Sequence, residues 1–324
     1  MKMTISIFKW HTKLKHIALP TVLVVLTLLL LRNIAKSNEE WELGLQVKTP
    51  EIESKEEVKF EIEAKQIPLE IRPGIFFDAW AYGLKDQPPT VPGPTIHVKE
   101  GTKVKIHFTN KLSVPASIHP HGVKYTIKHD GAHLAGNPNT IVLPGESRTY
   151  EWDTDGTPGT WVYHTHAFEF GGEKGLEKGL FGPIIVDPKG TQSPPDKEFI
   201  VFLTTYKIGD KTFEAFNDKS GEAAFFQGDT TAFPGEVFHA KVGEKVRFHL
   251  VNADSEEMHT FHIHGHRWKN QRGGELIDNV SLGPFTMYTL DIIAGEDVGQ
   301  GNWMVHCHFG SHMMMGMFGI LAVR

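Results

Sequence analysis

A long internal repeat sets the architecture that this 324-residue chain can adopt. The segment from His97 to Asn110 (HVKEGTKVKIHFTN) corresponds to the segment from His239 to Asn252 (HAKVGEKVRFHLVN) at a constant spacing of 142 residues. Aspartate, proline and glycine are concentrated in residues 187–197, between the two copies. The chain is therefore a duplication of one structural unit.

Each copy consists of about 130 residues of short runs and turns, the size and pattern of a Greek-key β-sandwich. Val-, Thr- and Phe-rich runs, together with 32 glycines and 19 prolines, indicate short strands and many turns. We predict an all-β protein with two tandem sandwich domains, residues 67–190 and 198–324, joined by a linker at 191–197. Residues 38–66 are charged and weakly alternating, and we interpret them as a linker that leads into a first edge strand.

Four His-x-His pairs follow the same repeat. The motif 119–122 (HPHG) matches the motif 262–265 (HIHG) at a spacing of 143 residues, and the motif 164–166 (HTH) matches 306–308 (HCH) at 142. Residues i and i+2 of a strand point to the same side, so each pair is expected to lie on one strand face. Eight imidazoles suit three coppers, with two on one ion and three on each of the others.

The only cysteine, Cys307, has no partner for a disulfide within the chain. His312 follows it by five residues and Met317 by ten. With one further histidine, these residues make the ligand set of a blue copper site, which transfers single electrons. His259 is available as that histidine, because the other two histidines of its motif belong to the paired set.

The residues before the cysteine, 302–305 (NWMV), indicate a buried strand. Successive side chains of a strand point to opposite faces, so Cys307 is expected to face one way and His306 and His308 the other. One tripeptide then holds copper on one face and ligates a separate centre on the other. This arrangement predicts an electron relay.

The blue-copper set occurs in the second half alone. Where the second half has His259, Cys307, His312 and Met317, the first half has Ala116, Thr165, Phe170 and Gly175. The paired histidines, by contrast, are present in both halves. One complete constellation is therefore missing from the first half while another is complete in both.

The first 37 residues differ from the rest of the chain. Four lysines precede an uncharged, Leu- and Val-rich run from Ile17 to Leu31, and no acidic residue occurs before Glu39. A basic region followed by an apolar one is typical of an export signal. The small residues of 35–37 (AKS) suit cleavage, whereas Arg32 suits an uncleaved anchor, and both alternatives stay open.

Without residues 1–37 the chain carries 27 basic and 39 acidic residues, a net charge of −12. An acidic exported protein is a poor binder of nucleic acid. The expected partners are neutral or cationic small molecules, or reduced metal ions.

The four motifs, in this order, resemble those of the multicopper oxidases, and a blue site in the second of two domains resembles the small bacterial laccases. The resemblance covers about residues 71–324 and implies cupredoxin-like domains with four coppers per chain. It implies type 1 copper at Cys307, His259, His312 and Met317. It implies type 2 copper at His119 and His262. It implies type 3 coppers at His121, His164 and His308, and at His166, His264 and His306.

The same resemblance implies the reaction. A reductant gives up electrons one at a time near His312, and Cys307 with its two neighbours passes them to the histidine-bound coppers, where O2 is reduced to two waters. Four protons must also arrive, for which Asp130 and Asp278 are candidates, each equally open as a surface or turn acid. Tyr125 is a candidate hydrogen-bond donor or transient electron source, with ordinary packing as the alternative.

The reducing substrate stays open between phenols or aryl amines, as in laccases, and Cu(I), Fe(II) or Mn(II), as in metallo-oxidases. Met313, Met314 and Met315 suit a soft patch for Cu(I), but we favour flexible packing around the copper. A copper carrier without turnover is a further alternative. So is a relative of copper nitrite reductase, although those enzymes have the type 1 site in the first domain.

The number of domains predicts an assembly. In larger multicopper oxidases the eight histidines meet between the first and last of three domains, whereas this chain has two. Three chains in a head-to-tail ring bring the first domain of one subunit against the second domain of the next. We therefore predict a homotrimer with trinuclear sites between subunits.

Overall fold

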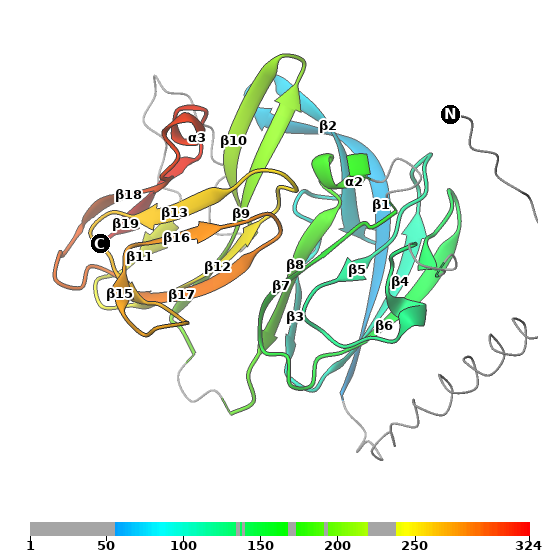
Figure 1. The fold of residues 1–324 in the computed structure, drawn as a ribbon, viewed down its shortest axis with the longest axis horizontal. Helices are drawn as coiled ribbons and strands as arrows, with labels where there is room; N and C mark the ends of the chain where they lie inside the picture. Colours follow the sequence, from blue (N-terminus) through cyan, green and yellow to red (C-terminus); the bar gives the residue numbers. More distant parts are fainter. Residues whose placement is uncertain (1–55, 134–136, 138–139, 168–172, 191–193, 220–237) are drawn as a thin grey trace, which may run out of the picture. The chain divides into compact units, whose positions relative to one another are not determined.

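The computed structural model describes residues 56–133, 137, 140–167, 173–190, 194–219 and 238–324. These residues form two β-sandwiches with few helices, which confirms the predicted all-β class (Figure 1). The predicted signal or anchor segment at 1–37 lies outside the described residues. In the part of the chain that is described, no helix is long and apolar enough to cross a membrane.

The first sandwich packs two sheets with the strand orders β2-β1-β4-β6 and β3-β8-β7-β5. Its strands are β1 (Glu57–Arg72), β2 (Ile75–Leu84), β3 (Ile96–Lys99), β4 (Lys103–Asn110), β5 (His119–Pro120), β6 (Ser147–Asp153), β7 (Gly159–His164) and β8 (Phe181–Asp187). A 3-10 turn, η1 (Ile127–His129), follows β5, and a short helix, α2 (Glu173–Glu177), precedes β8.

The second sandwich has the strand orders β10-β9-β12-β17 and β11-β19-β18-β13-β16. Its elements are β9 (Lys197–Ile208), β10 (Lys211–Asp218), β11 (Phe238–Ala240), β12 (Lys245–Asn252), β13 (His259–Ile263), β16 (Asn279–Leu282), β17 (Met287–Ile293), β18 (Gly301–Cys307), helix α3 (Gly310–Met314) and β19 (Phe318–Val323). A separate hairpin joins β14 (Trp268–Lys269) to β15 (Leu276–Ile277).

The two halves share one topology, as the sequence repeat predicts. The sheet β2-β1-β4-β6 corresponds, strand for strand, to β10-β9-β12-β17, and β3-β8-β7-β5 corresponds to β11-β19-β18-β13. Among the described residues, β14 and β15 have no strand counterpart in the first half, whereas the pairing of His259 with Leu282 on β16 corresponds to a single bridge between Ala116 and Val142. The histidine motifs therefore occupy equivalent strands in both halves.

Strand β1 corrects the interpretation of residues 56–66 as part of a linker with an edge strand after it, while residues 38–55 of that predicted linker lie outside the described residues. It begins at Glu57 and lies inside its sheet, antiparallel to β2 and parallel to β4. The charges that suggested a linker belong to its outward positions, where Glu57 pairs with Lys59 and Lys105. Alternate residues such as Ile62 are fully buried, so the apolar half of the pattern decides the structure.

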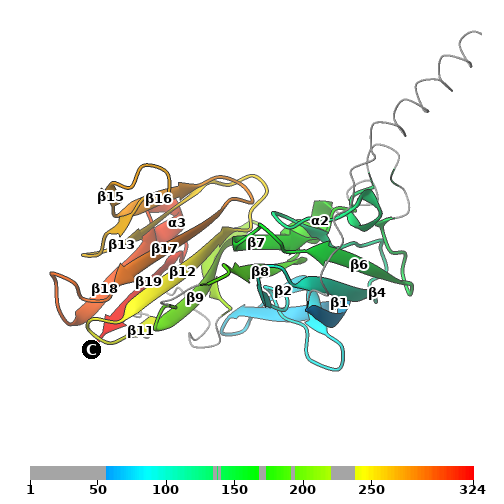
Figure 2. The ribbon, with the colours of Figure 1, turned by 90° about the horizontal axis from the view of Figure 1, so that it is seen from below.

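The two halves pack against each other through an apolar cluster of their own. Phe181 of β8 stacks on Phe202 of β9, with ring centroids 5.4 Å apart. The hydroxyl of Thr160 on β7 lies 2.6 Å from Nδ1 of His249 on β12. Figure 2 shows β7 and β8 beside β9 and β12. His249 thus contributes to the junction between the halves, where the sheet of β7 meets the sheet of β12.

Candidate metal centres

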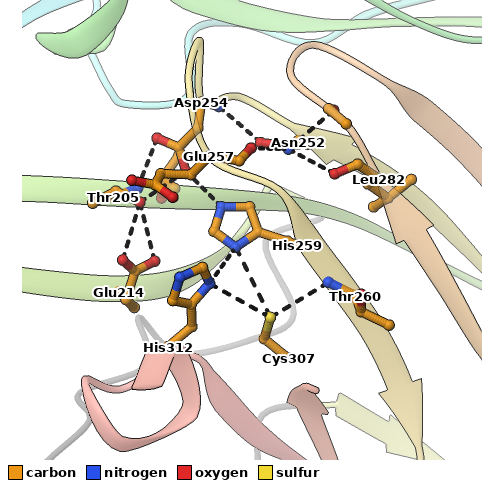
Figure 3. A network of polar contacts seen from close by, with 12 residues as sticks. Thr205, Glu214, Asn252, Asp254, Glu257, His259, Thr260, Leu282, Cys307 and His312 are labelled. Atoms are coloured by element: carbon orange, nitrogen blue, oxygen red, sulfur yellow. Dashed lines mark hydrogen bonds and ion pairs between the residues drawn. The ribbon is translucent and has the colours of Figure 1, made fainter. Parts of the chain in front are cut away.

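Cys307 ends β18 in the core of the second sandwich, with no exposed surface. His259 begins β13, the neighbouring strand, and His312 lies in α3, both of them buried. The Cys307 Sγ atom is 3.9 Å from His259 Nδ1 and 3.8 Å from His312 Nδ1, and the two nitrogens are 3.1 Å apart (Figure 3). The structure therefore brings together three predicted ligands from three separate elements.

These distances fit one metal ion. Bonds from a metal to nitrogen or sulfur are about 2.0–2.3 Å long, so two ligand atoms on one ion lie roughly 3–4 Å apart when the angle between their bonds is about 100–130°. Met317 is fully buried in the same apolar cluster as Cys307, and its carbonyl accepts a hydrogen bond from the Cys307 amide. A thiolate, two imidazoles and a buried thioether are the donor set that copper takes in blue sites.

The cysteine sulfur is also held from the side. The backbone amide of Thr260 donates to Cys307 Sγ at 3.4 Å. The first half keeps the same contact with oxygen in place of sulfur, because the Ser117 amide donates to Thr165 Oγ1 at 3.2 Å. A side chain at Gly175, the counterpart of Met317, would collide with Thr165. The first half therefore has the same backbone arrangement at this position, but Thr165 occupies the space in which a ligand side chain at position 175 would lie.

A group of acids that we did not predict lies behind His259. Asp254 accepts a hydrogen bond from His259 Nε2 at 2.6 Å, which leaves Nδ1 directed at the cysteine (Figure 3). Thr205 Oγ1 lies 2.8 Å from an Asp254 carboxyl oxygen and 3.0 Å from one of Glu214, so one hydroxyl lies within hydrogen-bond distance of both carboxyl groups. Asp254 precedes His259 by only five residues, but Glu214 comes from β10, and no sequence motif relates the two.

These contacts shift the acid–base properties of both groups. Burial lowers the pKa of His259, but the hydrogen bond with Asp254 and further contacts with Cys307 outweigh it and raise the pKa to about 9. Burial raises the pKa of Glu214 to about 7, with His259 as the main opposing influence. Asp254 and Glu214 therefore stabilise positive charge at His259, and they would stabilise the positive charge of a metal ion bound there in the same way.

The four paired histidines of the first half form one group. Nε2 of His121 and Nε2 of His164 lie 2.9 Å apart. The ring of His119 lies within about 5.4 Å of the other three rings, including that of His166. Strands β5 and β7 pair directly at His119 and His164, which explains how residues 45 positions apart meet.

The second half repeats this group. Nε2 of His264 and Nε2 of His306 lie 3.1 Å apart. The centroid of the His262 ring lies 5.1 Å from the centroids of the His264 and His308 rings. Strands β13 and β18 pair at His262 and His306, the equivalent position to the pair in the first half.

Backbone carbonyls orient these rings. His164 Nδ1 donates to the carbonyl of Thr165 at 2.8 Å, and His306 Nδ1 donates to that of Cys307 at 2.9 Å. Burial also lowers the pKa of His121, to about 4, and lowers the pKa of His164 and His306. Neutral rings with Nδ1 occupied present Nε2 as a lone-pair donor, which is what a metal ion requires.

The two groups stay separate within one chain. Among the described residues, every contact between two of these eight rings joins members of the same half. Each half offers one close Nε2 pair and two further rings. A site that needs three imidazoles on each of two ions therefore needs histidines from both groups.

The predicted proton carriers lie at the type 2 candidates. His119 Nδ1 donates to the carbonyl of Asp130 at 2.6 Å, and His262 Nδ1 donates to that of Asp278 at 2.7 Å. The Asp130 carboxylate is also 3.3 Å from His119, whereas that of Asp278 is exposed and accepts from a neighbouring asparagine. Tyr125 lies beside His119, with ring centroids 5.9 Å apart.

Tyr125 is tied to the same aspartate. Burial, followed by the charge of Asp130 and a hydrogen bond to it, raises the pKa of the Tyr125 hydroxyl to about 12. The three residues proposed for proton or electron handling thus all contact, or directly adjoin, a candidate copper ligand.

The sequence was compared with models of known protein families. Multicopper oxidase family models match residues 89–191 and 204–324, the two sandwiches. The chain belongs to the multicopper oxidase family. Copper is therefore the metal that this family membership implies for the ligand sets described above.

Relatives of this chain have names that refer to different activities. The chain is 58% identical over 268 residues to a probable nitrite reductase–hydroxylamine oxidoreductase fusion protein of Kuenenia stuttgartiensis, covering 82% of this chain and 31% of that protein. It is 28% identical to a human ferroxidase, over 70% of this chain and 22% of the ferroxidase. The chain thus spans less than a third of the length of either relative.

A solved multicopper oxidase has the same fold. Its crystal structure superposes with a TM-score of 0.68 at 29% identity, covering 83% of this chain and 89% of that one. The cupredoxin-like architecture expected from the sequence is confirmed by this likeness.

The buried carboxyl of Glu214 gives a prediction for the metal-free protein. Because its folded pKa is raised to about 7 from an ordinary 4.5, the folded state holds a proton that the unfolded state releases between these pH values. Its contribution to stability is therefore present at low pH and lost as pH rises to 7. Relative to wild type, Glu214→Gln is expected to gain up to about 3 kcal/mol of unfolding free energy between pH 4.5 and pH 8.

Urea unfolding of the two metal-free proteins across this pH range measures the difference. Glu151→Gln, at a half-exposed side chain of the first half, is the control and is expected to show no such trend. An equal difference between wild type and Glu214→Gln at all pH values contradicts the assignment.

Proposed function

We propose that this protein is an oxidase that couples one-electron oxidation of a small donor to the four-electron reduction of O2 to water. The observation that carries the proposal is the position of Cys307 at the end of β18: its sulfur lies beside His259, while His306 and His308 lie in the histidine group of the second half. Copper, when bound, supplies one-electron redox chemistry at the cysteine set and O2 chemistry at the histidine sets.

The assignment of ligands is the one that the resemblance to the family implies, and the close histidine pairs within each half are consistent with it. Cys307, His259 and His312, with Met317, are proposed to hold type 1 copper. The close pair His121 and His164 is proposed to share one type 3 copper with His308 of the other half. The close pair His264 and His306 is proposed to share the second with His166. The rings that adjoin Asp130 and Asp278, His119 and His262, remain for type 2 copper.

Donor oxidation is proposed to occur at the surface over His312. Phe309 stacks on the His312 ring, with centroids 5.1 Å apart, and is 42% exposed. Met314, two residues beyond His312, is 63% exposed. Flat and thioether side chains at this surface support contact with an aromatic donor, so phenols and aryl amines are the first class that we propose.

The route from donor to O2 uses consecutive residues. His306 Nδ1 donates to the Cys307 carbonyl, so the cysteine and the histidine set are joined by covalent bonds and by a hydrogen bond. Asp130, which contacts His119 and Tyr125, is proposed to hold a proton for the reaction. Asp278 is proposed to do the same on the solvent side of His262.

Removal of the thiolate tests the pairing of the two functions. Cys307→Ser is expected to lose the intense blue absorption and all oxygen uptake, because a serine hydroxyl does not replace a thiolate as a copper ligand. It is expected to keep about three of four coppers per chain, since eight histidines remain. Copper content, visible absorption and oxygen consumption measure these outcomes.

The control is Asn302→Ser, at an exposed position of the same strand, which is expected to keep colour and turnover. The similarity to a probable nitrite reductase fusion protein defines the alternative outcome. A wild-type protein with two coppers per chain that reduces nitrite and consumes no oxygen contradicts the proposal. Copper binding without any turnover would leave a copper carrier.

We also propose that three chains form a ring in which each trinuclear site combines the first half of one subunit with the second half of the next. The support is the separation of the two histidine groups within one chain, together with their need for each other to reach three imidazoles per type 3 copper. A head-to-tail interface of this kind closes into a ring when its rotation allows. Export, with residues 1–37 as signal or anchor, remains a proposal from the sequence.

Mixed assemblies test this arrangement. A chain with His164→Ala and His166→Ala lacks an intact first half, and a Cys307→Ser chain lacks an intact second half. Each alone is expected to be inactive. In equal random mixtures, about one interface in four pairs two intact halves, so about a quarter of wild-type oxygen uptake is expected. Mixed assemblies without activity, or a fully active monomer in ultracentrifugation, contradict the ring.

A metal cation is the second donor class that an observation favours. A pocket of about 160 Å³ beside the His259 network is lined by Glu177, Asp254, Glu256 and Glu257 and by two lysines. One of these, Lys178, is already paired with Asp78 at 2.8 Å. The pocket is therefore acidic, and carboxylates bind Fe(II) and Mn(II) well. The likeness to a human ferroxidase supports the same class.

Neutral variants of the pocket separate the two donor classes. Glu256→Gln with Glu257→Gln is expected to raise KM for Fe(II) on the order of tenfold by removing local negative potential, with KM for a phenol unchanged. Glu151→Gln is the matched control on the other half. Equal effects on both donors, or none on Fe(II), count against a cation site. A parallel exchange of Met313, Met314 and Met315 for Leu tests Cu(I) in the same assay.

A further inference from the structure

The turn between β16 and β17 has an unusual residue at its third position. The turn runs from Gly283 to Thr286, and the Thr286 amide donates to the Gly283 carbonyl at 3.1 Å. Pro284 occupies the second position, and Phe285 the third with a φ of +47°. A left-handed residue after proline in such a turn is normally glycine or asparagine, because a β-carbon is strained there. The requirements of the turn therefore do not explain why a phenylalanine occupies this position.

The internal repeat supplies the comparison. The equivalent turn of the first half runs from Leu143 to Glu146, closed by a hydrogen bond from the Glu146 amide to the Leu143 carbonyl at 3.0 Å. Pro144 is again second, and Gly145 is third with a φ of +81°. No other atom lies within 4 Å of the position that a β-carbon of Gly145 would take. One backbone thus carries the unstrained residue in the first half and a strained aromatic in the second.

The ring of Phe285 reaches across to the first half. Its centroid lies 4.8 Å from that of His164 and 6.3 Å from that of His121, the latter in a stacked orientation. These are the two imidazoles whose Nε2 atoms lie 2.9 Å apart. Phe285 also packs against the apolar cluster between the halves. A residue of the second sandwich therefore contacts the close histidine pair of the first.

We propose that Phe285 is a positioning residue for His121 and His164. Its ring holds the two imidazoles with their Nε2 atoms converging and keeps water from the side of the pair that faces the junction. The strain of the turn is the cost of bringing the ring there, because a residue free of strain at this position, as in the first half, has no ring. This role rests on the proposed assignment of the histidine pair to copper.

Three substitutions separate the ring from the turn. Phe285→Gly removes the ring and the strain and reproduces the turn of the first half. Phe285→Ala removes the ring but keeps the strain. Phe285→Tyr keeps the ring. In the metal-free protein, the Gly variant is expected to unfold at a higher urea concentration than the Ala variant, because only the Ala variant keeps the strained β-carbon.

Copper retention tests the role of the ring. Copper-loaded wild type and variants are challenged with a chelator, and copper per chain is followed beside the blue absorption of the Cys307 site. The Gly and Ala variants are expected to lose histidine-bound copper about tenfold faster than wild type, with the blue absorption decaying at the wild-type rate. The Tyr variant is expected to restore retention. Phe76→Ala, at an exposed ring of the first half, is the control.

The outcomes are distinct. Wild-type retention in the Gly variant, or equal acceleration of blue and histidine copper loss, overturns the role of Phe285 and leaves the proposed oxidase intact. A wild-type protein that binds no copper at the histidines overturns the proposed function and this inference with it.

Discussion

Side chains alternate along β18, and both ligand sets depend on this alternation. Cys307 faces the core of the second sandwich, while His306 takes part in the histidine group on the other side of the sheet. The register with β13, in which Phe261 pairs with Cys307 and His262 with His306, fixes which residue faces which side. A slip of one residue would exchange the two faces, so buried apolar neighbours that hold the register also hold the chemistry.

Hydrogen bonds to the far nitrogen orient the ligand rings in a common manner. In the histidine groups, backbone carbonyls accept from Nδ1 of His164 and His306 and leave Nε2 for the metal. At the cysteine site the roles of the nitrogens are reversed, because Asp254 accepts from Nε2 of His259 and leaves Nδ1. A carboxylate at this place stabilises positive charge on the site, which a neutral carbonyl does less strongly. The two kinds of centre are thus distinguished by what supports the ligands as well as by the ligands.

The candidate ligands could be named from the sequence because each belongs to a motif that the duplication repeats or omits as a whole. His119 and His262 were found by their common spacing, and Cys307 by being the one cysteine. The supporting residues that the sequence did not reveal act through contacts between strands that are far apart in the chain. Glu214 reaches the His259 network from β10 through Thr205, and Phe285 reaches His164 across the junction of the two halves. Only the position of Phe285 opposite Gly145 in the repeat offered a signal, and its meaning needs the three-dimensional contact.

Strand β1 shows the opposite case, in which a local signal was misleading. Its lysines and glutamates suggested a linker, but they occupy the solvent-facing half of an alternating pattern that continues for 16 residues. Burial of alternate apolar residues such as Ile62 outweighs the charge, and the strand pairs on both edges. The domain boundary therefore moves toward the N-terminus by ten residues, from 67 to Glu57.

The central proposal is that two separate ligand sets, one of them completed by a neighbouring chain, hold the redox metals. Anomalous diffraction at the copper edge from crystals of the copper-loaded protein tests it most directly. We expect four copper peaks per chain, one among Cys307, His259 and His312 and three between the first-half histidines of one chain and the second-half histidines of the next. Copper ions shared by the two histidine groups of a single chain, or no copper at Cys307, would contradict it.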